Sequence, residues 1–235
     1  MKSFSEIMTT APDECLPELR ELLSYHMLCE AGCPLVRQPD SGLFILERFP
    51  EPLHWSRQAE FPWVLKNAEI ESHHRVLEIG PSWTSLQYAM AKRCGQLHTI
   101  ELEADKMKEA AKVFAKLGLL DKVVQQQGNA LNLPFADATF DRVVCVSVLE
   151  HIDGDRMKCL EEAARVVKPG GRLLLTLDVV VDGDCKTEFF IKQDEAMEMT
   201  KRLGTGVRHQ SKVFINRMDV ENVALIVLMV CWVKE

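Results

Sequence analysis

Acidic and amide side chains follow short apolar segments in the middle of this sequence. Glu78 and Gly80 lie in VLEIG, Glu101 ends HTIE, and Asn129 follows VVQQQG. Carboxylates accept hydrogen bonds from sugar hydroxyls, and an amide can pair with the edge of a base. These residue types predict a site for a nucleoside-like ligand.

The segment after the first apolar run has the composition of a tight turn. Gly80, Pro81 and Ser82 join it to a helical pattern, and a glycine lets the backbone approach a ligand where a Cβ would collide. The dinucleotide fingerprint G-x-G-x-x-G needs more glycines, because Ser82 and Thr84 follow Gly80 here. The turn therefore favours a nucleoside site with a smaller, uncharged linker over a dinucleotide site.

The separation between the acidic residues is informative. Glu101 follows Glu78 at close to the roughly 20 residues expected for a ribose-binding acid. Glu78 could stabilise an ammonium group or arrange backbone amides. The alternatives are an exposed strand-end acid for Glu101 and a turn residue for Asn129.

Alternating strand and helix patterns must position these side chains. Strands are expected over 75–79, 97–102, 122–126, 142–148 and 172–181, with helices over 82–93, 104–116 and 156–167 and a turn at 169–171. A helix over 193–203 precedes strands over 207–215 and 224–233, which should pair antiparallel. This order predicts an α/β fold with a doubly wound, mostly parallel sheet, whose ligands bind at the carboxyl ends of the strands.

Residues 1–70 differ in composition from the rest. A helix is expected over 16–29, and residues 43–65 are rich in aromatic side chains. We expect an N-terminal helical and loop cap at 1–70 and a Rossmann-like domain at 71–235.

Composition narrows the class of protein. The chain has 235 residues, 47% of them hydrophobic, and a formal net charge of −7. This balance argues against binding to a nucleic-acid backbone. We expect no secretory leader, because residues 1–10 contain no apolar core, and the longest apolar run, 223–230, is too short to span a bilayer. The eight cysteines are therefore expected to be reduced, in a cytoplasmic protein.

Two groups could suggest a metal, and both are disfavoured. Cys29 and Cys33 lack a third cysteine, because position 36 is Val36. His73 and His74 are adjacent and should form a solvated pair before the first strand. No metal site is expected.

Four blocks in order carry a family resemblance: VLEIGPSWTSLQYAMAK, HTIELEADKMKEAAK, GNALNLPFADATFDRVVCVSVLEHI and EEAARVVKPGGRLLLTLDV. Together they resemble the class I S-adenosylmethionine-dependent methyltransferases, especially the ubiquinone and menaquinone biosynthesis group. The resemblance covers about residues 74–181. It implies a seven-stranded sheet with an antiparallel last strand.

The resemblance also implies roles for individual residues. Glu78 and Gly80 would line the methionine end, Glu101 would hold the ribose, and Asn129 and Ala130 would frame the adenine. Arg57 could pair with the methionine carboxylate. The full set of expected cofactor contacts is Glu78, Gly80, Pro81, Ser82, Glu101, Leu102, Asn129, Ala130, Val146, Ser147 and Arg57.

Three positions depart from the family pattern. Ser82 and Thr84 stand where glycine is common, and Asn129 stands where aspartate is common. Residues 182–193 match nothing in the family pattern.

The implied reaction is in-line methyl transfer from S-adenosylmethionine to a small molecule, which releases S-adenosylhomocysteine. His151 is the best-placed candidate base, with a packing role as its alternative. Two other functions stay open: a catalytically silent binding or regulatory protein, and a protein methyltransferase. The acidic balance makes an RNA acceptor less favoured. The sequence does not indicate an oligomeric state.

Overall fold

The strands and helices alternate over most of the chain. The computed structural model describes residues 17–18, 21–22, 35–37, 44–46, 56–82, 84–182, 190–216 and 224–235. The strands are β1 Leu35–Arg37, β2 Phe44–Leu46, β3 Arg75–Ile79, β4 Gln96–Glu101, β5 Val123–Gln127, β6 Phe140–Val146, β7 Val167–Asp182, β8 Ile191–Lys192, β9 Val207–Asn216 and β10 Ala224–Val233. The α-helices are α3 Arg57–Ala68, α4 Ser85–Arg93, α5 Ala104–Lys116, α6 Arg156–Val166 and α7 Gln193–Leu203. Short 3₁₀ turns are η2 Leu120–Lys122, η3 Leu149–His151 and η4 Gly204–Gly206.

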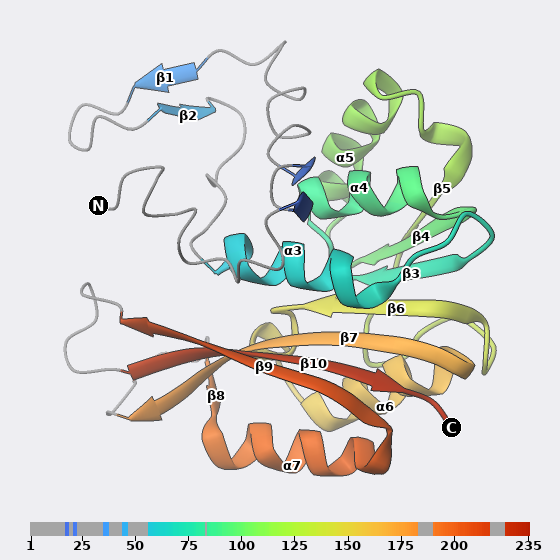
Figure 1. Cartoon of the computed structure of the whole chain (residues 1–235). Coiled ribbons are helices and arrows are strands. Elements are labelled where there is room, and N and C mark those ends of the chain that lie inside the picture. Colours follow the sequence, from blue (N-terminus) through green and yellow to red (C-terminus); the bar gives the residue numbers. More distant parts are fainter. Residues whose placement is uncertain are drawn as a thin grey trace.

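The main sheet has the order β5-β4-β3-β6-β7-β10-β9, with β8 beside β7 (Figure 1). Strands β3 to β7 pair in parallel, whereas β10 lies antiparallel between β7 and β9. The predicted fold class is confirmed, including the antiparallel last strand. The strand β8, in the segment that matched nothing, was not predicted.

Helices cover both faces of this sheet (Figure 1). One apolar core joins α3, α4 and α5 to residues such as Val76 and Val144, and the other joins α6 and α7 to Leu77 and Val143. Successive strand residues thus face opposite cores, which explains the unbroken apolar runs of the central strands.

Helix α3 lies within the expected cap region and packs on β7 and β10. Its last carbonyl groups are held by arginines of the sheet. The Arg172 guanidinium donates to Asn67 O at 2.7 Å, and that of Arg142 donates to Ala68 O and to Glu69 O. These contacts satisfy acceptors that a helix end otherwise leaves unpaired. The division at residue 70 stays a prediction.

Two element ends differ from the expected ones for a backbone reason. Helix α4 begins at Ser85 rather than at 82, because Ser82 has φ +53° and Thr84 is extended. Strand β6 ends at Val146 because Ser147 has φ +46°. Left-handed residues cannot continue a helix or a strand.

A further difference lies in β7. The segment 169–171, expected as a turn, belongs to this strand, which shifts register against β6 near its start. Gly170 still has φ +74°, and its N–H donates to Lys234 O at 2.7 Å.

The N-terminal region contains a pairing that was not predicted. Strands β1 and β2 pair antiparallel where only helix and loops were expected. Of the predicted helix 16–29, the described residues 17–18 and 21–22 are helical. Cys29 and Cys33 lie outside the described residues.

Cys94, Cys145, Cys159 and Cys231 are buried free thiols. Among the described residues, no helix combines the length and apolar character needed to cross a bilayer.

Candidate active site

The predicted site residues gather at the carboxyl edge of the parallel strands. Gly80 N–H donates to Ile100 O at 2.8 Å, and Gly128 N–H donates to Glu101 O at 3.0 Å. These bonds join the ends of β3, β4 and β5. The strand order reverses between β3 and β6, where open α/β sheets bind their ligands.

Gly80 occupies a position that tolerates no side chain. Its φ is +60°, and a Cβ built there would lie 2.9 Å from Cγ2 of Val148. The loop after β6 therefore closes directly on the turn after β3. Pro81 is buried beside it.

The Glu101 carboxylate is 6% exposed and held by backbone donors. Oε2 accepts from Ser82 N–H at 3.0 Å, and Oε1 accepts from Leu102 N–H at 2.8 Å and Glu103 N–H at 3.2 Å. Three donors fix the orientation of the carboxylate. A ligand hydroxyl must share these oxygens or use the remaining lone pair.

Ser82 is held from two sides. Besides the bond to Glu101, its carbonyl accepts from Nε2 of Gln87 at 3.1 Å. A left-handed non-glycine residue costs roughly 1–2 kcal/mol and persists where neighbours hold it. Nothing in the sequence pattern singles out Gln87, because its partner lies five residues earlier across a turn.

Several buried polar atoms near this turn lack hydrogen-bond partners. Among the described residues they include Oε2 of Glu78, Oγ1 of Thr84, Oγ of Ser85 and Oε1 of Gln87. An unsatisfied buried polar group costs about 1–3 kcal/mol. The Glu78 oxygen can accept and the Thr84 and Ser85 hydroxyls can donate, so a ligand with both a cationic donor and an anionic acceptor suits these three. These residues fit the zwitterionic methionine end of S-adenosylmethionine.

The pKa of the Glu78 carboxyl group lies far above its usual value. Burial, aided by the charge of Glu101, raises its pKa to about 8. Its side chain is therefore mostly neutral at pH 7 and could ionise beside a cation.

The loop after β5 is more exposed. Oδ1 of Asn129 accepts from Leu131 N–H at 2.9 Å, so the turn role that its sequence suggested is present. The Nδ2 amide forms no hydrogen bond with a described residue and could meet a base. Ala130 is half-buried, and Leu102 is 65% exposed, which leaves an apolar surface beside Glu101.

A second carboxylate links α3 to Ser147, just after β6, and to Thr176 in the middle of β7. Oε1 of Glu60 accepts from Oγ of Ser147 at 2.6 Å and from Oγ1 of Thr176 at 2.5 Å, and Oε2 accepts from Nη1 of Arg57 at 2.5 Å. Burial alone would raise the pKa of Glu60, but Arg57 and the two hydroxyls hold it below its usual value. The network fixes Ser147, next to Val146 at the end of β6.

Arg57 is thus already paired. Burial favours its neutral form, but Glu60, Asp178 and Glu150 hold its pKa above the ordinary value. A methionine carboxylate would have to compete with Glu60 for this guanidinium. The role predicted for Arg57 stays a prediction.

The 3₁₀ turn η3 carries Glu150 and His151. Glu150 is 1% exposed and accepts from Asp178 N–H at 2.7 Å. Burial and the charge of Asp178 raise its pKa to about 8. His151 is exposed, and its role as a base stays a prediction.

The histidine pair lies at the opposite, amino end of β3. His74 is 6% exposed and accepts from Glu71 N–H at 3.0 Å, so the expectation that both rings are solvated is wrong for His74. Ligand atoms of Glu71, His73 and His74 lie within 4.8 Å of one another.

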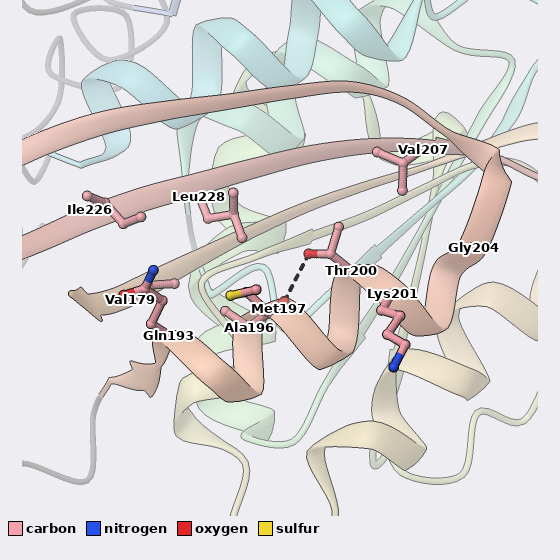
Figure 2. A pocket seen from close by; sticks show the side chains of 10 residues that line it. All are labelled: Val179, Gln193, Ala196, Met197, Thr200, Lys201, Gly204, Val207, Ile226 and Leu228. Atoms are coloured by element: carbon pink, nitrogen blue, oxygen red, sulfur yellow. Dashed lines mark hydrogen bonds between the residues drawn. The ribbon is translucent and has the colours of Figure 1, made fainter.

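A groove of about 500 Å³ runs along α7 (Figure 2). Met197 and Thr200 of α7 face Val179, Ile226 and Leu228 of the sheet there. None of the predicted site residues lines this groove, so it is separate from the strand-end site.

The comparisons with known proteins agree with this geometry. Residues 77–175 match the family model described as a methyltransferase domain. The uncharacterized methyltransferase YcgJ of Bacillus subtilis is 38% identical over 116 residues, which are 48% of this chain and 44% of YcgJ. Demethylmenaquinone methyltransferase of Lactiplantibacillus plantarum is 30% identical over 124 residues, 52% of this chain and 50% of that protein.

Solved structures share the fold. The crystal structure of YcgJ has a TM-score of 0.52 at 18% identity and covers 75% of this chain and 98% of that one. The structure of the [4+2]-cyclase SpnF has a TM-score of 0.63 at 16% identity and covers 96% and 98%.

The family match identifies a methyltransferase domain over residues 77–175, and the fold is the Rossmann-like fold of the class I methyltransferases. The resemblance seen in the sequence is confirmed, and the matches support S-adenosylmethionine as the cofactor. The chain spans about half the length of the curated relatives it matches.

Proposed function

We propose that this protein transfers a methyl group from S-adenosylmethionine to a small-molecule acceptor. The observation that carries the proposal is the set of orphaned polar atoms beside Glu101. The acceptor on Glu78 and the two hydroxyls, on Thr84 and Ser85, suit one zwitterionic ligand.

Each group has a role in binding. Oε2 of Glu78 would accept from the α-ammonium, and the Thr84 and Ser85 hydroxyls would donate to the α-carboxylate. Glu101 would bind the ribose, and Asn129 with exposed Leu102 would meet the base. The cofactor supplies a methyl group already activated on a sulfonium.

The remaining contribution of the protein is alignment. Orienting two reactants can lower a barrier by roughly 7–11 kcal/mol, so in-line displacement needs little further chemistry. Val146 would flank the transferred methyl together with Ser147, which is fixed through Glu60. Where the acceptor must lose a proton, exposed His151 is our candidate base.

Titration calorimetry of the folded protein with S-adenosylmethionine and S-adenosylhomocysteine tests the binding step. We expect saturable binding of both, and its absence at millimolar ligand would contradict the proposal. Incubation with radiolabelled S-adenosylmethionine and a metabolite extract then tests transfer. We expect label in small molecules, whereas label only in protein would indicate a protein acceptor.

A second candidate is a protein that uses the fold without methyl transfer. It is favoured by the match to SpnF over nearly the whole chain, because SpnF is named as a [4+2]-cyclase. Ser82 and Asn129, which depart from the family pattern, also favour it. Cofactor binding without any transferred label would support this candidate. The cytoplasmic location stays a prediction.

A further inference from the structure

Ser82 adopts a conformation that its side chain disfavours. Its φ of +53° lies in the left-handed region, where glycine is at ease. Glu101 accepts from its N–H at 3.0 Å, and Gln87 donates to its carbonyl at 3.1 Å. Side chains from β4 and α4 thus hold both polar groups of one residue.

Gln87 is committed to this contact. It is 0% exposed, lies in the first turn of α4, and turns its Nε2 back to the loop. Its Oε1 is buried without a partner, which is a cost that packing alone does not explain. The Nε2 group of the amide is therefore the part that bonds to the loop.

We propose that Gln87 is a positioning residue that holds Ser82 in the left-handed conformation and thereby orients Glu101 for the cofactor. The part of this inference that concerns the cofactor rests on the proposed function. Gln87 thus holds a serine in the conformation that a glycine at this position would adopt through its own backbone freedom.

The mechanism is a shift in conformational population. If Ser82 leaves the left-handed region, its N–H leaves Oε2 of Glu101, and the carboxylate loses one of three orienting donors. The apparent dissociation constant then rises as the competent fraction falls. A glycine at position 82 would adopt the same conformation unaided, so it should remove the need for Gln87.

Four proteins test this: the unchanged chain, Gln87→Met, Ser82→Gly and the double variant. Methionine keeps the buried volume and removes the donor. In cofactor-free protein, we expect Gln87→Met to speed amide hydrogen exchange at residue 82. We also expect it to weaken binding of S-adenosylhomocysteine about 3- to 10-fold. In the Ser82→Gly background, the same change should alter both measurements less than about twofold.

Gln125→Met is the matched control. Gln125 also donates from Nε2 to a backbone carbonyl at 3.1 Å, that of Met107, away from the loop. We expect it to leave exchange at residue 82 and cofactor affinity unchanged. Gln87→Leu, which also removes the donor and keeps a similar volume, replaces Gln87→Met if that variant does not fold.

Equal effects of the Gln87 change in the serine and glycine backgrounds would overturn the proposal, as would no effect in either. The exchange measurement needs no cofactor. If the unchanged chain binds no S-adenosylhomocysteine, the proposed function fails while the exchange data still decide the role of Gln87.

Discussion

Two buried glutamates of this protein are used in opposite ways. Glu60 and Glu78 are 0% and 2% exposed, and both lie near the carboxyl edge of the sheet. Glu60 accepts from Arg57, Ser147 and Thr176, and its pKa is lowered. Glu78 has an orphaned Oε2 and a pKa raised to about 8.

The comparison shows that burial does not decide the role of a carboxyl group. The Glu60 carboxylate stabilises the fold, because a guanidinium and two buried hydroxyls donate to it. Glu78 has an unused oxygen and thus capacity for a ligand. We therefore propose a structural role for Glu60 and a binding role for Glu78.

The largest expected effect is on Glu60. Glu60→Gln should lower the free energy of unfolding by about 3–5 kcal/mol, because it removes the buried charge to which Arg57 and two hydroxyls donate. Chemical denaturation measures this change. Asp105→Asn, in the exposed pair with Lys108, is the control and should have no measurable effect. A loss below about 1 kcal/mol for Glu60→Gln would contradict the structural role of Glu60.

Glu101 should act on binding more than on folding. Glu101→Ala should weaken S-adenosylhomocysteine binding by roughly 1–3 kcal/mol, the loss expected for hydrogen bonds to a charged group. Calorimetry gives the affinity and a thermal melt gives the stability. Unchanged affinity would remove Glu101 from the site.

The pH dependence sharpens the contrast. A carboxyl group whose pKa is raised on folding stabilises below its unfolded value, near 4.5, and this contribution is lost as the pH rises through about 8. The ligand-free protein should therefore lose roughly 2–3 kcal/mol for each of Glu78 and Glu150 between pH 6 and pH 9, at about 1.4 kcal/mol per pH unit up to the folded pKa. Denaturation at several pH values measures the loss.

Glu78→Gln should flatten this dependence, because the amide does not titrate. Glu60 contributes outside this window, since its pKa is lowered and its stabilisation is lost only in acid. An unchanged slope in Glu78→Gln would show that Glu78 is not neutral near pH 7.

The smallest effect is expected for His151. Because its side chain is exposed, His151→Asn should leave stability and cofactor affinity unchanged. If His151 is the base, only the turnover rate and its pH profile change. A loss of affinity would indicate instead that the residue contacts the cofactor.

Much of the fold could be predicted because the apolar periodicity is local. The bounds of β3, α5, α7 and β10 agree with the sequence prediction. The start of α4 could not be predicted, because the left-handed turn at Ser82 depends on Gln87 and Glu101. The pairing of β1 with β2 uses short segments with no alternating pattern.

In the site, the residues at the strand ends could be predicted from the sequence, whereas the hydrogen-bond networks around them could not. Glu78, Glu101 and Asn129 could be placed at strand ends, since each follows an apolar run. Glu60 lies in the aromatic-rich segment 43–65, but the sequence gives no sign of the residues that donate hydrogen bonds to it. Ser147 and Thr176 lie 87 and 116 residues away along the chain.

The raised pKa of Glu78 also has a calorimetric consequence. A neutral carboxyl group that comes to face an ammonium ion gives its proton to the buffer. The measured heat of association should then include the ionisation enthalpy of that buffer. Titrations near pH 7 in phosphate and in Tris should differ in heat while agreeing in affinity, and the difference counts the protons released.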